Sequence, residues 1–334
     1  MNYCDFTNEQ IAGQMIIAGF YGTKPDDELK FLINTIKAGG VILFSRNIES
    51  RHQLEDLCSS IQRYAKQAGQ PPLFIAIDQE GGKVARLKEP FTIFSGAPYI
   101  KTPEQAEKFA EITGEELKRT GINMNMAPVL DIAPENFENS AMAGRMFCGN
   151  PEQAGELGAE VIRGLQKKNV ISVAKHFPGI GRATVDSHFK LPNLIQNRFA
   201  LDSFELIPFK AAINVKAAGI MTSHVIYPKI DALWPAGLSR KIITNILRTE
   251  LGYDGLVITD DLDMGAIDKY YDLDLVIDRI LTVETDIALI CKNTANIKKA
   301  FDLILDFIKS SPFNKARCKR SLQRIIKTKT KYLA

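Results

Sequence analysis

The sequence predicts an α/β protein that folds as a single (β/α)8 barrel over residues 1–334. Short apolar runs rich in β-branched residues alternate with amphipathic helical patterns along most of the chain. These runs are continuously apolar, as is typical of parallel strands buried on both faces. Seven or eight such β/α units in this length indicate a closed barrel, and a doubly wound open sheet is the alternative. No linker rich in Ser, Gly or Pro divides the chain, so one domain is expected.

Seven runs are predicted to be strands, and a segment near residues 15–20 supplies an eighth that is helical in part. The seven runs cover residues 40–44, 73–77, 123–128, 172–174, 219–222, 256–259 and 287–290. Several intervening helices carry clear start signals. Asn150 precedes Pro151, Thr102 precedes Pro103, and Ser239 precedes an apolar helical stripe. A capping side chain followed by proline is a common helix beginning.

Composition excludes several classes of protein. The net charge of +3 is too small for a dedicated nucleic-acid binder. The five cysteines are scattered, which favours reduced thiols and a cytoplasmic location over disulfides or a structural zinc site. The amino-terminal residues show no signal peptide, and no apolar run is long enough to span a membrane. The Lys- and Arg-rich last twenty residues are predicted to form a solvated helix face, and a monomer is expected.

Polar residues follow directly after most predicted strands, where a barrel places its chemistry. Because buried charges are costly unless paired or used, five such groups at one rim predict a functional site. The groups begin at Asp78, Asp131, Lys175-His176, Ser223-His224 and Asp260-Asp261.

Asp260 directly follows its strand, so its carboxylate is expected at the mouth, as a nucleophile or a charge stabiliser. Asp261 is the rival for that role, and a helix N-cap or first-turn position is its structural alternative. Lys175 and His176 are candidates for binding a polar substrate. Ion pairs with Asp131 or Asp78 are the alternative for those two residues.

A carboxylate two residues before an imidazole, Asp186 and His188, lies on a glycine-rich loop. Histidine titrates near neutral pH, and a carboxylate beside it orients the ring and raises its basicity. The pair therefore indicates a proton-transfer dyad, whereas the alternative is an ordinary surface histidine.

Together these motifs resemble the family 3 glycoside hydrolases, specifically bacterial β-N-acetylglucosaminidases of the cell-wall recycling type. The resemblance runs nearly end to end and is carried by motifs in order: Gly39-Gly40-Val41-Ile42-Leu43-Phe44-Ser45-Arg46-Asn47, Ile77-Asp78-Gln79-Glu80-Gly81-Gly82, Ala127-Pro128-Val129-Leu130-Asp131, Lys175-His176-Phe177-Pro178-Gly179, Asp186-Ser187-His188, Ser223-His224-Val225-Ile226-Tyr227 and Thr259-Asp260-Asp261-Leu262. Each motif is weak alone, and the ordered set is specific.

The resemblance implies a retaining glycosidase that needs no cofactor and acts on N-acetylglucosamine-containing, muropeptide-type glycosides. It implies Asp260 as nucleophile and His188 as general acid/base, with Asp186 as the dyad partner of that histidine. It implies that five further residues hold the sugar and its 2-acetamido group: Asp78, Arg86, Arg145, Lys175 and His176.

Three residues depart from the family pattern. Ile180 stands where a second histidine is usual, Met146 replaces the usual serine, and Cys148 follows Phe147. These changes leave the proposed nucleophile and dyad intact, but they alter the surroundings of the loop and with it leaving-group preference.

Other mechanisms and functions fit parts of the same pattern. Asp260 and Asp261 could polarise the substrate's own acetamido group, as in substrate-assisted hexosaminidases. A histidine acid/base tolerates an anionic acceptor, which fits a β-N-acetylglucosaminide phosphorylase. A metal-dependent barrel hydrolase has less support, because the chain lacks the His-x-His and His-Glu-x-x-His patterns. A non-catalytic sugar-binding barrel is the last alternative.

Overall fold

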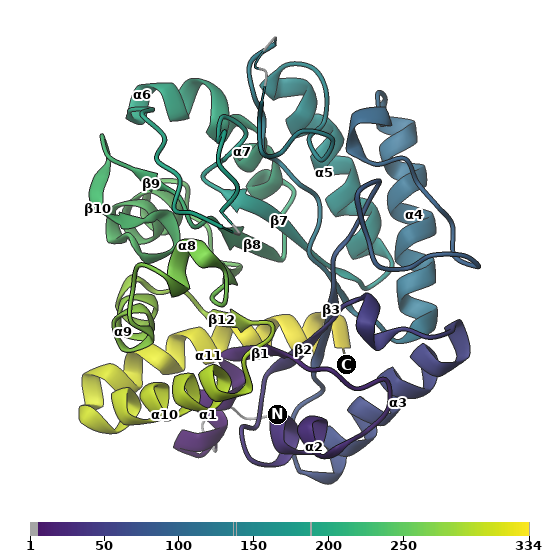
Figure 1. Ribbon diagram of the computed structural model, residues 1–334, viewed down its shortest axis with the longest axis vertical. Coiled ribbons are helices and arrows are strands. Elements are labelled where there is room, and N and C mark those ends of the chain that lie inside the picture. Colours follow the sequence, from purple (N-terminus) through teal and green to yellow (C-terminus); the bar gives the residue numbers. More distant parts are fainter. Residues whose placement is uncertain (1–5, 136, 138, 188, 334) are drawn as a thin grey trace.

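The computed structural model describes residues 6–135, 137, 139–187 and 189–333, and in this part eight parallel strands close into a barrel (Figure 1). Neighbouring strands pair in parallel all round, and Ile16 opposite Ala288 closes the ring. In chain order, the strands are β1 (Ile16–Gly19), β2 (Gly40–Leu43), β3 (Phe74–Ile77), β6 (Met124–Asn125), β7 (Ile171–Phe177), β8 (Gly219–Thr222), β11 (Leu256–Asp261) and β12 (Ile287–Ile290). The predicted barrel is therefore confirmed, and the open sheet is excluded. The eighth segment forms strand β1, and the expected helical part lies just before it, because α1 (Asn8–Gln14) ends at Gln14.

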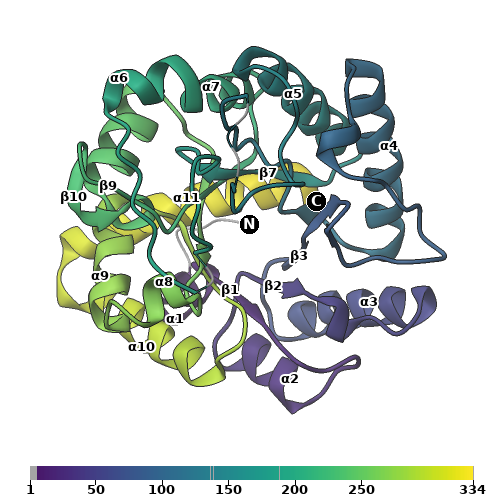
Figure 2. The same ribbon diagram turned by 45° about the horizontal axis from the view of Figure 1, so that its top comes forward.

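Helices surround the barrel and bury their apolar stripes against it (Figures 1 and 2). The outer helices are α2 (Asp27–Asn34), α3 (Arg51–Gln67), α4 (Pro103–Thr120), α5 (Pro151–Lys167), α7 (Leu206–Asn214), the π-helix η6 (Lys241–Glu250), α9 (Leu273–Val283), α10 (Thr294–Ser310) and α11 (Pro312–Leu333). The predicted start signals are present as hydrogen bonds. Thr102 accepts from the amide of Gln105, Asn150 from that of Gln153, and Ser239 from that of Ile242. Each cap satisfies an amide that would otherwise lack a partner at a helix start.

Short elements fill the connections between the carboxyl ends of the strands and the helices that follow. They are η2 (Ser45–Asn47), the hairpin β4 (Gln79–Gly81) and β5 (Val84–Ala85), η3 (Ala97–Tyr99), α6 (Arg198–Ala200), η4 (Leu201–Glu205), the pair β9 (Ile226–Tyr227) and β10 (Asp231–Pro235), η5 (Ala236–Leu238) and α8 (Gly265–Asp268). We call this end of the barrel the mouth and the opposite end, where the strands begin, the floor. The long connections at the mouth leave room for a site, as in other barrels of this kind.

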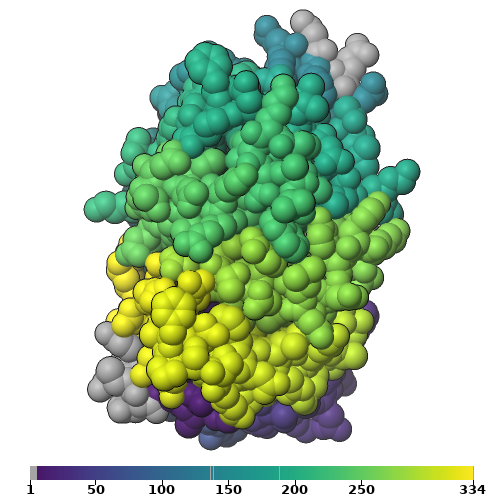
Figure 3. All heavy atoms as spheres, turned by 90° about the vertical axis from the view of Figure 1, so that its left-hand side faces the viewer, coloured from purple at the N-terminus to yellow at the C-terminus, as the bar shows by residue number. Residues whose placement is uncertain are grey.

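Helix α11 crosses the floor and packs beside the amino-terminal segment (Figure 3, yellow and purple). The Lys329 ammonium is buried beneath it and donates to Gln14 Oε1 at 2.7 Å and to the carbonyl oxygen of Gly39 at 2.8 Å. Burial lowers the pKa of Lys329 well below its usual value. Arg324 reaches the buried carboxylate of Asp286. The expectation of a fully solvated basic face is therefore wrong for these two residues.

Among the described helices, none has the length and apolarity that crossing a membrane requires.

Candidate active site

A cavity of about 410 Å³ opens at the mouth of the barrel, between the carboxyl ends of the strands. Seven of the eight residues singled out in the sequence line it: Asp78, Arg86, Arg145, Lys175, His176, Asp186 and Asp260. They come from the ends of four strands (β3, β6, β7 and β11) and the connections that follow them, so the fold gathers residues up to 182 positions apart, from Asp78 to Asp260. The eighth, His188, lies outside the described residues.

Lys175 lies at the centre of an ion-pair cluster on one side of the cavity. Its ammonium is 2.7 Å from Asp78 Oδ1 and 2.6 Å from Glu80 Oε1, and only 2% of the side chain is exposed. Arg86 contacts the other oxygen of Asp78 at 3.1 Å and lies over the ring of Phe44. Burial alone would raise the pKa of Asp78, but Lys175 and Arg86 outweigh it and hold that pKa well below its usual range. The cluster therefore presents fixed charges with pre-oriented donors and acceptors.

Arg145 is held in place by Glu80. Two parallel hydrogen bonds join them, from Nε to Oε2 at 2.9 Å and from Nη2 to Oε1 at 2.7 Å. Such a fork fixes the guanidinium plane as well as its position. Burial would lower the pKa of Arg145, but the Glu80 carboxylate raises it, so the side chain stays charged. The sequence motif contained Glu80, yet only the structure reveals that this residue orients two cations of the site.

His176 is oriented by Asp131, a fully buried carboxylate in the connection that follows β6. Asp131 Oδ2 lies 2.6 Å from His176 Nδ1, and Asp131 Oδ1 accepts from the amide of Ile180 at 2.7 Å. This contact fixes the position of the His176 ring, and no hydrogen bond to Nε2 is described among these residues. The ion-pair alternative is confirmed for Lys175 and His176. Both residues also line the cavity, and their role in substrate binding stays a prediction.

Asp260 projects from the end of β11 into the cavity. Its Oδ1 accepts from the amide of Asp261 at 2.8 Å. Burial would raise its pKa, but the nearby His176, His224 and Lys175 outweigh burial and lower it. His224 holds its place through Nε2, 3.1 Å from the carbonyl oxygen of Asp261. Asp260 is therefore ionised and has a lone pair directed at the cavity, which a nucleophile requires.

Asp261 has a different environment. Its Oδ1 accepts from the amides of Asp263 and Cys291, each at 3.1 Å, and burial raises its pKa to about 6. The alternative of a helix N-cap or first-turn position for Asp261 is wrong, because α8 begins only at Gly265. Asp261 instead anchors the end of β11 to the residue that follows β12.

The loop that carries Asp186 lies over the β11 connection. Backbone amides of Phe189 and Lys190 donate to the carbonyl oxygen of Asp186, which closes a turn there. The next carbonyl, of Ser187, accepts from the amide of Ala266 at 3.1 Å. Asp186 also lines the cavity beside Asp260. The connections after β7 and β11, which carry the predicted dyad and nucleophile, are thus tied together at the mouth.

The residues that depart from the family pattern occupy distinct places. Ile180 is 5% exposed and lines the cavity with other apolar side chains, including Met142 and Ala183. Met146 packs against the core, and Cys148 is exposed with its Sγ 3.5 Å from the carbonyl oxygen of Pro98. Only Ile180 of the three lines the cavity.

A closed parallel barrel with an ionised aspartate, oriented histidines and paired cations at the strand ends is the architecture of a barrel enzyme. The family model "Glycosyl hydrolase family 3 N terminal domain" matches residues 7–328. The chain belongs to glycosyl hydrolase family 3.

Relatives of known identity agree with this assignment. Beta-hexosaminidase A of Pseudoalteromonas piscicida is 37% identical over 91% of this chain, which spans 55% of that protein. The beta-hexosaminidase of Pseudomonas aeruginosa (strain LESB58) is 35% identical over 84% of this chain and 82% of its own length. Among solved structures, a family 3 β-N-acetylglucosaminidase from Paenibacillus sp. str. FPU-7 superposes with a TM-score of 0.95 at 37% identity, over 98% of this chain and 63% of that one. The chain thus spans little more than half the length of some relatives.

Proposed function

We propose that this protein is a retaining β-N-acetylglucosaminidase that removes terminal β-linked N-acetylglucosamine from muropeptide-type cell-wall glycosides. One observation carries the proposal: the ionised Asp260 lies at the end of β11 in the same cavity as the Lys175–Asp78–Arg86 cluster and His176. The relatives named β-hexosaminidase supply the sugar class.

In the proposed mechanism, Asp260 attacks the anomeric carbon while His188 protonates the glycosidic oxygen. The C1–O bond to the leaving group breaks and a C1–Oδ bond to Asp260 forms. In the second step His188 takes a proton from water, whose oxygen then attacks C1 and releases Asp260. Two inversions give net retention of configuration. Asp186 favours the protonated imidazole in the first step.

The charged cluster would hold the sugar ring. Asp78 accepts from ring hydroxyls while Lys175 and Arg86 keep that carboxylate ionised and fixed. His176, held by Asp131, presents Nε2, and Arg145, held by Glu80, presents its remaining N–H groups. Because these groups are already held in place by partners within the protein, they need little rearrangement when the substrate binds.

The first test compares aryl β-N-acetylglucosaminide with aryl β-glucoside on the same enzyme preparation. A strong preference for the acetamido sugar is expected, and equal rates would contradict the assigned sugar class. Turnover that depends on phosphate and yields a sugar 1-phosphate would show a phosphorylase instead.

The second test traps the intermediate with a slow fluorosugar and maps the adduct by mass spectrometry. We expect the label on the peptide that contains Asp260. Failure to trap any adduct on an enzyme that still hydrolyses the acetamido substrate would favour the substrate-assisted route.

We further propose a cytoplasmic monomer. Cys58, Cys291 and Cys318 are buried as free thiols, which suits a reducing compartment. Gel filtration and fractionation of the source cells would test both statements.

A further inference from the structure

A second cavity, of about 480 Å³, lies at the floor of the barrel, on the opposite end from the candidate active site. We call it the floor cavity. It is enclosed by α11 and by the connections that lead into β8 and β11. Its lining consists of Ile213, Lys216, Ala217, Ala218, Gly252, Tyr253, Asp254, Gly255, Arg324, Lys327, Thr328, Lys331 and Tyr332. Its volume is in the range of small-molecule sites, roughly 300–1,000 Å³.

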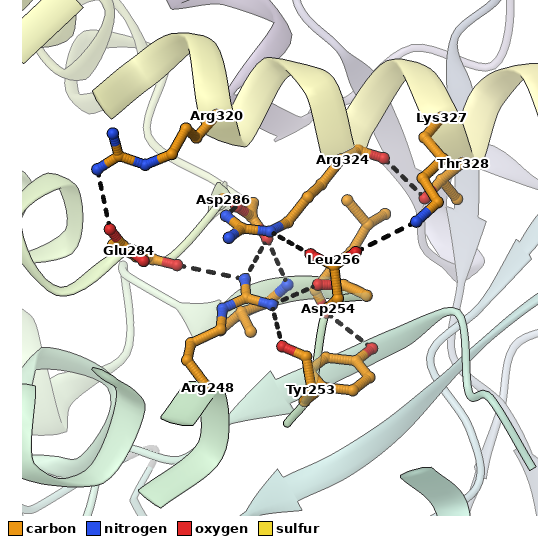
Figure 4. A network of polar contacts seen from close by, with 12 residues as sticks. Arg248, Tyr253, Asp254, Leu256, Glu284, Asp286, Arg320, Arg324, Lys327 and Thr328 are labelled. Atoms are coloured by element: carbon orange, nitrogen blue, oxygen red, sulfur yellow. Dashed lines mark hydrogen bonds and ion pairs between the residues drawn. The ribbon is translucent and has the colours of Figure 1, made fainter. Parts of the chain in front are cut away.

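The charge of the lining is strongly asymmetric. Four cationic side chains face one carboxylate, that of Asp254. Arg324 is engaged, because it pairs with Asp286 at 3.1 Å and with Asp254 at 3.3 Å (Figure 4). No carboxylate partner is described for Lys216 or Lys331. Lys327 contacts Asp254 at 3.2 Å, but both side chains are about 70% exposed, at 73% and 69%. Such an exposed pair is weak, so Lys327 can turn to another anion.

The walls of the floor cavity are fixed before any ligand binds. Arg248 donates to the carbonyl oxygens of Tyr253 and Gly255 at 2.9 and 2.7 Å, and to Asp286 at 2.6 Å (Figure 4). The Tyr253 hydroxyl donates to the carbonyl oxygen of Ala217 at 3.1 Å, which joins the two connecting loops. These bonds use the backbone acceptors of the loops and leave the lysine ammonium groups at the rim.

Tyr332 contributes to the apolar part of the cavity wall. It is 8% exposed and lines the cavity, and its hydroxyl is buried without a hydrogen-bond partner among the described residues. The ring itself adds apolar surface next to Ile213 and Ala218.

We propose that the floor cavity binds a phosphorylated small molecule. The phosphate sits among Lys216, Lys327 and Lys331, and the organic part packs against the tyrosines. Lysine ammonium groups bind phosphate as point charges, and several of them neutralise a dianion better than a carboxylate. The volume exceeds what inorganic phosphate needs, so a sugar phosphate or a nucleotide fits better. This site is separate from the mouth and does not depend on the proposed hydrolysis.

Isothermal titration calorimetry on the full chain tests the proposal with four probes: inorganic phosphate, glucose 6-phosphate, AMP and unphosphorylated glucose. We expect one of the two organic phosphates to bind at one site per chain, about ten-fold or more tighter than inorganic phosphate. The comparison of glucose 6-phosphate with AMP identifies the organic class. Binding of neither organic phosphate, or equal binding of glucose and glucose 6-phosphate, would overturn the proposal.

Two pairs of charge-matched variants locate the site. Lys216→Gln with Lys331→Gln should weaken binding about ten-fold or more, because two charge-assisted contacts are lost. Lys315→Gln with Lys319→Gln removes the same net charge on α11 outside the cavity and should leave affinity unchanged. Equal losses in both double variants would show general charge attraction and contradict a site.

Discussion

The two ends of the barrel use buried carboxylates in opposite ways. At the floor, Asp286 is fully buried, and both of its oxygens are occupied. Arg248 and the amide of Val257 donate to Oδ2 at 2.6 and 2.9 Å, and Arg324 donates to Oδ1 at 3.1 Å (Figure 4). At the mouth, Asp260 accepts one backbone hydrogen bond among the described residues, and His176, His224 and Lys175 lower its pKa.

This difference shows how the surroundings of a buried aspartate decide whether it has a structural or a catalytic role. A carboxylate whose lone pairs are all used joins elements together, here β11, β12, η6 and α11. A carboxylate with a free lone pair facing a cavity, kept ionised by nearby positive charge, is available to a substrate. The division agrees with the general rule that barrels place stability at the floor and catalysis at the mouth.

The most direct test of the difference between the two ends is a substitution of Asp260. Asp260→Asn keeps an oxygen for the Asp261 amide but removes the negative charge. We expect kcat/KM on aryl β-N-acetylglucosaminide to fall about 10⁴-fold or more, as for other lost nucleophiles. Thermal unfolding should change little, because Asp260 has no ion pair within 4 Å among the residues that the structure describes. A variant that retains more than a tenth of the activity would exclude Asp260 as the nucleophile.

His188→Ala tests the other half of the proposed machinery. General acid/base catalysis is worth ~10²–10⁴-fold, so hydrolysis of an ordinary disaccharide should fall by about that factor. An activated aryl leaving group needs no proton, so the first chemical step on that substrate should be nearly unchanged. Burst kinetics with the aryl glycoside measure that step. Equal losses on both substrates would contradict the acid/base role.

At the floor, the largest effect should be on stability. Asp286→Ala leaves Arg248 and Arg324 without their buried partner, which typically costs about 3–5 kcal/mol. Urea unfolding measures this loss. Asp254→Ala is the matched control, because its 69% exposed carboxylate forms only surface pairs worth less than about 1 kcal/mol. If the two variants lost similar stability, the contrast between the two ends would fail.

Sequence patterns predicted the elements of the barrel and seven of the residues that line the cavity at its mouth. Continuous apolar runs fix which segments can be buried strands, and the polar residues that follow them fall at one rim because parallel strands share a direction. For this reason Asp78, Lys175 and Asp260 could be placed near one another without coordinates.

The partners of those residues could not be predicted in the same way. Glu80 orienting Arg145 and Asp131 orienting His176 are contacts between different connections, whose paths the sequence does not specify. The burial of Lys329 was missed for a related reason. A Lys-rich helix looks solvated in sequence, and only its position across the floor shows which of its turns faces the strands.

The smallest predicted effect distinguishes the two adjacent aspartates at the mouth by pH. Burial raises the pKa of Asp261 to about 6, above the usual value of 3.8 for the unfolded chain. Between these values the folded protein holds a proton that the unfolded chain has released, so stability should fall as pH rises through this window, by at most about 1.4 kcal/mol per pH unit.

Asp261→Asn keeps an acceptor for the amides of Asp263 and Cys291 but cannot ionise. The variant should therefore be more stable than the wild type at pH 7, by about 1–2 kcal/mol after solvent screening, and similar to it near pH 4. Urea unfolding at several pH values from 4 to 8 checks this, and parallel profiles for the two proteins would show that Asp261 does not titrate there.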